Sequence, residues 1–160
     1  MKVSIIGAGT MGAGIAQIAA TNGHEVYLFD SFDGAIKNAE TKLNKILNRL
    51  VEKDRISDQE KNDILSRINF SEKLVDISGS GLVIEAIIEN LEIKQKIFTD
   101  IEKLVDNDCI IASNTSSLSI ASISSACEKS ERVIGIHFFN PAPLMPLVEI
   151  IPAVQTSAEI

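Results

Sequence analysis

The stretch KVSIIGAGTMGAGIA, residues 2–16, decides the fold. A short apolar run leads directly into a turn with Gly7, Gly9 and Gly12 in the spacing G-x-G-x-x-G, and a helical pattern follows. Alone, this spacing is a weak signal. It becomes specific when a strand precedes it, a helix follows it and an acidic residue ends the next strand. Asp30 ends the next apolar run, 18 residues after Gly12, so the whole pattern is present.

Each part of this motif has a physical purpose in binding a dinucleotide. Gly7 permits a tight turn, Gly9 lets a pyrophosphate approach the backbone, and Gly12 lets the helix pack closely on the strand. The amino end of the helix attracts the phosphate charge. Asp30 would accept hydrogen bonds from the adenosine ribose and repel a 2′-phosphate, so the motif predicts NAD and not NADP. The alternative is a turn-and-packing motif without a ligand.

Apolar runs of strand length recur along the chain and alternate with helical patterns. Most of the runs are continuously hydrophobic, as expected for strands that are covered on both faces. The alternation predicts a doubly wound α/β domain with a mostly parallel sheet and right-handed crossovers. The expected strands cover residues 2–6, 25–29, 81–86, 109–113, 132–138 and 147–151, and the expected helices include 10–22 and 91–105, the latter with Ile93, Ile97, Ile101, Leu104 and Val105 on one stripe.

The connection after Asp30 is too long for a simple crossover. A helical pattern with one apolar face covers residues 34–53. Ser57 and Glu60 then form a capping box that opens a second short helix through Ile68. We expect this two-helix insertion to form an arm. It is either an amphipathic hairpin that covers the sheet face, which is the simpler interpretation, or a wall against the far end of a ligand.

Composition restricts the class of protein. At 160 residues the chain has the size of one domain that can bury a real core. The formal net charge of −7 argues against a nucleic-acid partner. No apolar stretch approaches the roughly 20 residues of a membrane-spanning helix, and no leader precedes the first run, so we expect a cytoplasmic protein. Cys109 and Cys127 match neither a metal-ligand nor a redox spacing, which predicts two small buried or half-buried thiols and no metal site.

A histidine lies at the carboxyl end of one expected strand, the edge where ligands gather in open parallel sheets. After His137 the loop NPAPLMP turns the chain back, so that Glu149 on the return strand can face it. A histidine held by a carboxylate keeps one tautomer and has its protonated form stabilised, which suits a base that removes an alcohol proton. For a lone histidine the simpler interpretation is a satisfied core residue. The shared edge with the glycine loop favours catalysis.

Two further motifs lie at the same edge. In SNTSS, the side chains of Asn114, Ser116 and Ser117 offer hydroxyl and amide groups to a substrate or to the nicotinamide ribose. Ser116 or Ser117 would serve equally well as the cap of the next helix. In EAIIEN, Glu89 is a candidate for contact with the cofactor, whereas Glu85 is a candidate for a structural role.

The segments GAGTMGAGIA, VIEAIIEN, ASNTSSL and HFFNPAPLMPLVE together resemble the amino-terminal domain of the 3-hydroxyacyl-CoA dehydrogenase family, most closely its bacterial 3-hydroxybutyryl-CoA branch. The resemblance covers nearly the whole chain, and the last two segments in this order are highly specific. It implies NAD as cofactor and an oxidoreductase of fatty-acid or butyrate metabolism. Its reaction would transfer hydride between NAD(H) and a short-chain 3-hydroxyacyl-CoA.

The resemblance also implies roles for single residues. His137 is then the catalytic base, Glu149 is its partner, and Ser116 contacts the substrate oxygen. The expected cofactor contacts are Gly7, Gly9, Thr10, Met11, Gly12, Asp30, Glu89, Lys94 and Asn114, and the expected substrate contacts are Ser116, Asn140 and Lys53 of the arm, which reaches CoA.

The chain also departs from the family pattern. Pro146 stands where many relatives carry a lysine, which changes the charge and stiffness of the loop and leaves the proposed pair untouched. The family has a second, all-helical domain that closes the cleft and forms the dimer. We therefore expect residues 1–160, with the arm at 34–68, to be the cofactor-binding half of a homo-oligomeric enzyme and to have little or no activity alone. Two alternatives remain: a nucleotide-binding module without activity, and a dehydrogenase of another small hydroxy acid, which CoA dependence would separate.

Overall fold

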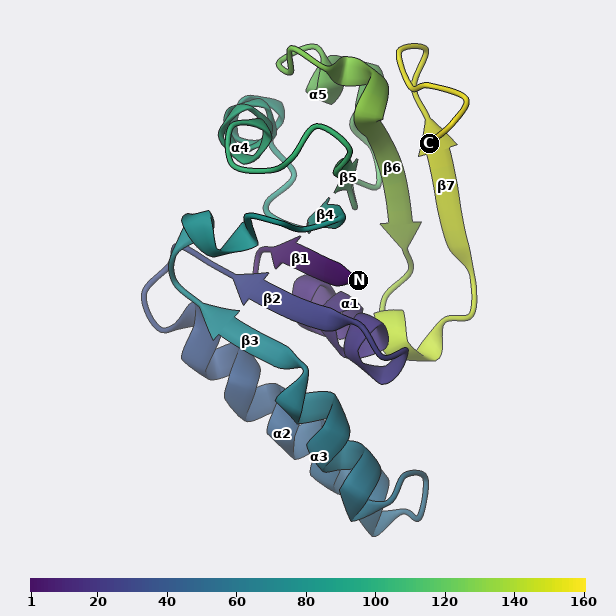
Figure 1. The fold of residues 1–160 in the computed structure, drawn as a ribbon. Helices are drawn as coiled ribbons and strands as arrows, with labels where there is room; N and C mark the ends of the chain where they lie inside the picture. Colours follow the sequence, from purple (N-terminus) through teal and green to yellow (C-terminus); the bar gives the residue numbers. More distant parts are fainter.

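The computed structural model describes residues 1–160 as one sheet with helices on both faces (Figure 1). The strands are β1 (Lys2–Ile6), β2 (Glu25–Phe29), β3 (Ile68–Ser71), β4 (Leu82–Glu85), β5 (Ile110–Ser113), β6 (Val133–Phe138) and β7 (Val148–Pro152). The helices are α1 (Thr10–Thr21), α2 (Ala35–Glu52), α3 (Asp58–Ser66), α4 (Leu91–Glu102) and α5 (Ile120–Ser124), with short 3-10 turns η1 (Leu74–Ile77), η2 (Ser130–Arg132) and η3 (Ala142–Leu144).

The seven strands lie in the order β3-β2-β1-β4-β5-β6-β7. The first six are parallel, and β7 runs antiparallel to β6. This arrangement confirms the predicted doubly wound α/β fold. From β1 the chain adds β2 and β3 on one side and then β4, β5 and β6 on the other, so the strand order reverses between β1 and β4. Ligands bind at this point in such sheets. None of the helices combines the length and the hydrophobicity that crossing a bilayer requires.

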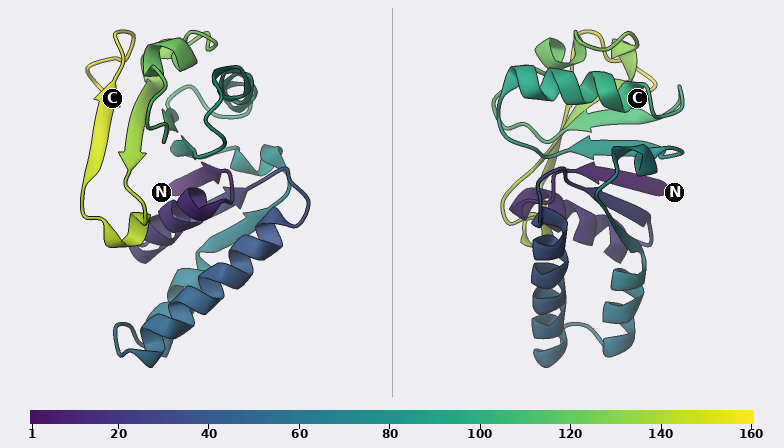
Figure 2. Two further views of the ribbon diagram at one scale, coloured as in Figure 1. Left: turned by 180° about the vertical axis from the view of Figure 1, so that it is seen from behind. Right: turned by 90° about the vertical axis from the view of Figure 1, so that its left-hand side faces the viewer.

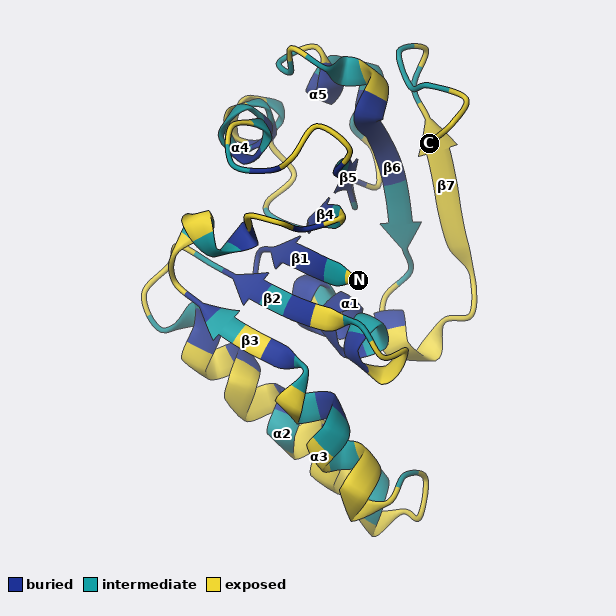
Figure 3. Cartoon of the chain, in the orientation of Figure 1, coloured by how far each residue is buried: buried dark blue, intermediate teal, exposed yellow.

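Two apolar cores lie on opposite faces of the sheet (Figure 2). The core beneath α1, α2 and α3 contains Ile5 and Leu28, and the core beneath α4 and α5 contains Phe98 and Ile123. Because the central strands are buried on both faces, their sequences are continuously hydrophobic. The edge strand β7 differs, since all of its residues are exposed (Figure 3).

The edge strand β3 was not predicted. The second helix of the arm was expected to reach Ile68, but α3 ends at Ser66 and Ile68 begins β3. Residues of β3 pair in parallel with β2. Only Asn69 of its four residues is exposed, and the strand contains only two apolar side chains, Ile68 and Phe70. Such a short amphipathic run cannot be told from a helix end by periodicity alone.

One expectation about a helix face was wrong, and one alternative about a helix cap is excluded. Ile93 of α4 was expected in the core stripe, yet it is 43% exposed, whereas Lys94 is 1% exposed. The following helix α5 is capped by neither Ser116 nor Ser117. Its cap is Ser119, whose hydroxyl accepts a hydrogen bond from the Ser122 amide. Asn90 caps α4, because its side chain accepts a hydrogen bond from the amide of Ile93.

The arm has the predicted capping box. The Ser57 hydroxyl accepts a hydrogen bond from the Glu60 amide at 3.1 Å, and the Glu60 carboxylate accepts one from the Ser57 amide at 2.7 Å. Figure 1 shows α2 and α3 side by side, with their far ends extending beyond the sheet. The arm therefore both covers one face and projects from it. The α2 side chains buried in the core are Ile36, Ala39, Leu43 and Leu47.

The two cysteines are free, as expected. Cys109 is buried and Cys127 is half-buried. Burial raises the pKa of each thiol to about 11. Because the thiolate is the reactive form, both side chains are protonated and unreactive near neutral pH.

The contact between β1 and α1 depends on a glycine. A Cβ atom at Gly12 would lie 1.7 Å from the carbonyl oxygen of Gly7, a distance that no packing adjustment of side chains can relieve. At Gly9, by contrast, a Cβ atom would meet nothing within 4 Å. Gly12 thus sets the distance between helix and strand, and Gly9 faces open space.

We predict that Gly12→Ala destabilises the chain by about 3 kcal/mol or more, because the added methyl group forces the backbones of α1 and the preceding turn apart. Gly9→Ala is the matched control and should change the free energy of unfolding by less than about 1 kcal/mol. Urea denaturation followed by circular dichroism measures both. Equal stability of the two variants would contradict the packing role of Gly12.

Candidate active site

The glycine loop forms part of a cleft of about 740 Å³. Gly7 has φ of +104°, a conformation that side chains with a Cβ atom rarely adopt. No side chain caps the amino end of α1, which begins at Thr10, and its first turn has no acidic residue. The first amides of α1 are therefore free to bind an anion at the positive end of the helix dipole. Thr10 and Met11 line the same cleft.

Asp30 lies at the wall of this cleft, where β2 ends. One carboxylate oxygen accepts the Ala8 amide at 2.7 Å, and the other accepts the Phe32 amide at 2.9 Å. These bonds hold the carboxylate beside the glycine loop. A carboxylate in this place suits ribose hydroxyls and repels a further phosphate.

The opposite walls of the cleft carry apolar side chains that the sequence did not identify. Phe32 is 74% exposed, and Ile88 and Ile93 are also exposed, yet all three line the cleft above Asp30. Large exposed apolar side chains gathered in one cleft are typical of a ligand site. With the uncapped helix and the carboxylate, these walls fit adenosine and pyrophosphate. Hydrophobic periodicity could not reveal them, because it assigns such residues to the core.

A second cleft, of about 320 Å³, adjoins the first one, since Met11, Ala86 and Ile87 line both. It gathers predicted site residues from three strand ends and their loops. The polar or titratable side chains that line it are Glu89, Asn114, Ser116, His137 and Asn140.

His137 and Glu149 face each other across β6 and β7, where they are direct partners in the antiparallel register. The His137 Nδ1 atom lies 2.8 Å from the Glu149 carboxylate. Because an ionised carboxylate can only accept a hydrogen bond, Nδ1 is the protonated nitrogen, and in the neutral imidazole Nε2 then keeps the lone pair. The Phe139 ring lies 4.8 Å from the His137 ring, between centroids, and shields it on one side. The predicted pairing is therefore present in the geometry.

Glu89 connects this cleft to the loop that carries Ser116. One of its oxygens accepts hydrogen bonds from the Thr115 hydroxyl and from the amides of Ser116 and Ser117, at 3.0 Å and 3.2 Å for the amides. Partial burial acts to raise the pKa of Glu89, but the Thr115 hydroxyl, the Lys94 ammonium and the Ser116 amide outweigh it and lower the pKa to about 2. Glu89 is therefore a fixed anion at neutral pH.

Asn114 joins β5 to the end of β6, because its side-chain oxygen accepts the Phe138 amide at 2.8 Å. This bond holds the backbone next to His137. Two predicted contacts lie elsewhere. Lys94 is buried behind Glu85 and Glu89, so its ammonium does not face either cleft. Lys53 is exposed at the end of α2, within the projecting arm, and lines none of these clefts.

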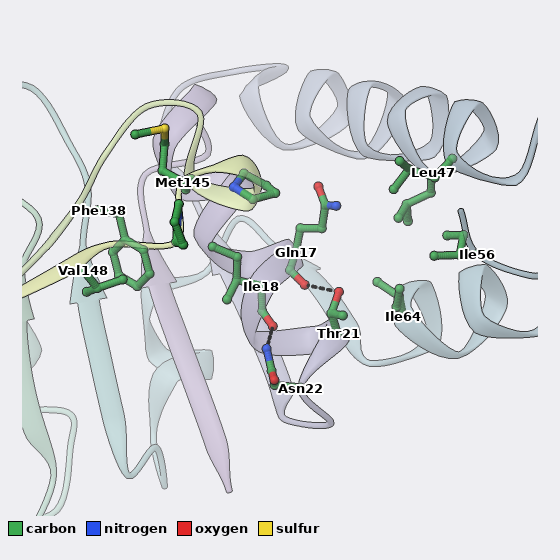
Figure 4. A pocket seen from close by; sticks show the side chains of 14 residues that line it. Gln17, Ile18, Thr21, Asn22, Leu47, Ile56, Ile64, Phe138, Met145 and Val148 are labelled. Carbon is green, nitrogen blue, oxygen red and sulfur yellow. Dashed lines mark hydrogen bonds between the residues drawn. The ribbon is translucent and has the colours of Figure 1, made fainter. Parts of the chain in front are cut away.

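A third hollow, of about 380 Å³, lies between the arm, α1 and the loop after β6 (Figure 4). Its walls are mostly apolar, and Phe138 and Val148 form the side nearest to the His137–Glu149 pair. Figure 4 shows the Gln17 side chain pointing into it. Gln17 is only 6% exposed, and its side-chain oxygen has no hydrogen-bond partner. A buried amide without a partner is costly, so this hollow has an unused polar group inside an apolar wall.

Comparison with known proteins identifies relatives of the whole chain. The family described as "3-hydroxyacyl-CoA dehydrogenase, NAD binding domain" matches residues 2–160. The chain is 43% identical to a 3-hydroxybutyryl-CoA dehydrogenase of Clostridioides difficile over 98% of its length and 56% of that relative, and 44% identical to one of Bradyrhizobium diazoefficiens over 97% and 53%. The crystal structure of (S)-3-hydroxybutyryl-CoA dehydrogenase from Ralstonia eutropha superimposes with a TM-score of 0.96 at 42% identity and covers 99% of this chain and 56% of that one. The chain thus spans about half the length of the curated relatives it matches.

The lowered pKa of Glu89 predicts a pH dependence of stability. Its pKa falls from 4.5 to about 2 on folding, so the ionised carboxylate stabilises the fold above pH 4.5, and this contribution is lost as the pH falls from 4.5 to 2. We expect the unfolding free energy of Glu89→Gln to change less with pH in this window. The difference from the unsubstituted chain should be small, because solvent screens the partly exposed carboxylate. Urea denaturation at stepped pH measures it.

Glu52→Gln, at an exposed position on the arm, is the matched control and should keep the slope of the unsubstituted chain. An identical slope in the Glu89→Gln chain would show that the hydrogen bonds to Glu89 do not stabilise its charge.

Proposed function

Because the chain belongs to the 3-hydroxyacyl-CoA dehydrogenase family, as its NAD-binding domain, we propose that the protein transfers hydride between NAD(H) and C3 of a short-chain 3-hydroxyacyl-CoA. The observation that carries this proposal is the His137–Glu149 pair in a cleft that adjoins the one fitted to NAD. Ser116 lines the same cleft as His137. A base, an oxygen ligand and a dinucleotide site are the parts that oxidation of an alcohol requires.

In the oxidation direction, His137 accepts the proton of the substrate hydroxyl at Nε2. Glu149 accepts the Nδ1 proton, which fixes the tautomer and the orientation of the ring. The Ser116 hydroxyl donates a hydrogen bond to the same substrate oxygen and holds it near Nε2. A dinucleotide held by the glycine loop and Asp30 would supply the acceptor for the hydride from C3.

In this proposal, different residues around the two adjoining clefts bind different parts of the cofactor. We assign the pyrophosphate to the open backbone at Gly9 and the uncapped amides of α1, and the adenosine ribose to Asp30. We assign the nicotinamide ribose to Glu89 and Asn114, which line the adjoining cleft. Lys94 then acts on the cofactor through Glu89, because its ammonium is buried behind that carboxylate.

The third hollow supports an acyl-CoA as the substrate. A pantetheine arm is an apolar chain interrupted by amides, and the hollow is an apolar groove that is also lined by Gln17, whose side-chain oxygen has no hydrogen-bond partner. It begins at Phe138 and Val148, beside the proposed base, and is bounded on its far side by the arm, which carries Lys53. We propose that the pantetheine arm lies in this groove and that Lys53 contacts the nucleotide end of CoA.

The chain by itself is a candidate for a second, simpler function, because it spans about half the length of its relatives. We propose that residues 1–160 bind NAD(H) but turn over acyl-CoA slowly. Ser116 lies on an exposed loop, and Glu149, which holds the His137 ring, lies on the exposed edge strand β7. A misplacement of either by about 1 Å can cost a hundredfold in rate. Dependence on CoA distinguishes the proposed reaction from that of another hydroxy-acid dehydrogenase.

We predict that His137→Gln in the full-length protein lowers kcat by about 10²–10⁴-fold, because the amide cannot accept the hydroxyl proton. The affinity for NADH should stay unchanged, since His137 makes none of the bonds assigned to the cofactor. NADH emission measures this affinity, and the same substitution in the 160-residue chain, which has no tryptophan, gives the reading without tryptophan background. Turnover that survives the substitution would reject His137 as the base.

We predict that Gln17→Leu in the full-length protein raises KM for a 3-hydroxyacyl-CoA by about 2–10-fold, the cost of one lost hydrogen bond. KM for the S-ethyl thioester of the same acid, which lacks the pantetheine amides, should not change. Gln59→Leu on the exposed face of α3 is the matched control. Equal changes in KM for both substrates would exclude a contact between Gln17 and the pantetheine arm.

A further inference from the structure

Glu85 is the most completely buried carboxylate at the site. It ends β4 and has an exposed fraction of 0%. One of its oxygens accepts the Ile87 amide at 2.7 Å and the Lys94 ammonium at 2.6 Å, and the other accepts the Ser113 hydroxyl at 2.7 Å. These donors come from the loop after β4, from α4 and from β5. Glu85 therefore joins three elements that meet at the carboxyl edge of the sheet.

Lys94 continues this connection toward the cleft. Its ammonium lies 2.6 Å from Glu85 and 3.3 Å from the second oxygen of Glu89, and its side chain is 1% exposed. Burying two charges costs a large desolvation energy, and an apolar pair of the same shape often stabilises a fold as well or better. Stability alone is thus a weak reason for an ion pair at this place.

Glu89 is the member of this chain of contacts that reaches the cleft. Its side chain is 36% exposed, and its carboxylate would otherwise rotate freely at the end of a long side chain. Lys94 holds one of its oxygens, which leaves the other to accept the amides of Ser116 and Ser117. The position of the Ser116 loop therefore depends on a carboxylate that a buried lysine fixes.

We propose that Glu85 is a positioning residue: through its buried pair with Lys94 it fixes Glu89, and through Glu89 it fixes the backbone of Ser116 at the reaction cleft. This inference rests on the proposed function, in which Ser116 holds the substrate oxygen and Glu89 contacts the nicotinamide ribose. It assigns to Glu85 and Lys94 a joint effect on catalysis without contact with substrate or cofactor. The Glu85–Lys94 pair thus links Glu89, the proposed cofactor contact, to the loop that carries Ser116, the proposed substrate contact.

The chain offers a matched control in a second largely buried ion pair. Arg132 and Glu102 lie 3.5 Å apart, with side chains that are 5% and 11% exposed. Neither residue lines the clefts around the glycine loop or His137. A variant of this pair loses a buried charge partner as the Glu85 variants do, but it does so away from the site.

The test compares Glu85→Gln, Lys94→Met and the double variant with Glu102→Gln in the 160-residue chain. Amide hydrogen exchange of Ser116 and Ser117, measured by NMR against the core amide of Ile111, reports the position of the loop separately from global unfolding. Thermal unfolding measures stability, and NADH titration measures the dissociation constant for the cofactor, which depends on Glu89 in this proposal. The double variant removes both buried charges, so its stability should recover relative to the single variants.

We expect exchange at Ser116 and Ser117 to accelerate about tenfold or more relative to Ile111 in both single variants, and to stay fast in the double variant despite its recovered stability. The dissociation constant for NADH should rise about tenfold in the same three chains. Glu102→Gln should lower the melting temperature while leaving both readouts unchanged. In the full-length protein, kcat should fall in the double variant and stay unchanged in Glu102→Gln.

Slow exchange at Ser116 and Ser117 in the double variant would overturn the proposal, because the loop would then keep its position without the ion pair. Equally accelerated exchange of these two amides in Glu102→Gln would also overturn it, because the faster exchange would then reflect general destabilisation of the fold. Amide exchange at Ser116 and Ser117 tests the positioning role of Glu85 even when no cofactor is bound. Failure of the unsubstituted chain to bind NADH would instead contradict the cofactor contacts of the proposed function.

Discussion

At Gly12 the backbone of α1 lies so close to the turn after β1 that a methyl group there would sit 1.7 Å from the carbonyl oxygen of Gly7. This approach places the free amides of α1 at the carboxyl edge of the sheet, beside Asp30 at the end of β2. Because β1 to β6 are parallel, each of these strands brings its last residue to the same edge, and the antiparallel β7 brings its first residues there. The site is thus a consequence of strand direction combined with one close helix–strand contact.

The edge also shows how polar groups are tolerated inside an apolar domain. Glu85 is fully buried, but its oxygens accept an ammonium, a hydroxyl and an amide, so that each oxygen has at least one donor. The arrangement satisfies the requirement that a buried charge be both paired and hydrogen-bonded. It also makes the edge rigid on the side of β4 and β5, where Glu89 and Asn114 add bonds to neighbouring loops.

The sequence was sufficient for the parts of the fold that rest on long or well-defined patterns. The glycine motif with Asp30, the continuous strands and the Ser57 capping box all appear where expected. It failed at β3, whose four residues carry too little periodicity, and at Ile93, which is apolar but exposed in the cofactor cleft. The burial of Lys94 was also beyond a sequence pattern, because a lysine at that position on α4 looks like a solvent-facing residue until Glu85 is placed beneath it.

The two halves of the site differ in how they are held. Glu89 is fixed by a buried lysine and by several donors from one loop, whereas the position of Glu149 depends on the pairing of β7 with β6. That strand lies at the sheet edge, and all of its residues are exposed. Its backbone bonds to a single neighbour, and unlike the other edge strand, β3, it has no buried residue to anchor it. The Glu89 side of the site is consequently held by buried groups of the domain, while the orientation of the His137 ring depends on Glu149 and therefore on the pairing of β7 with β6.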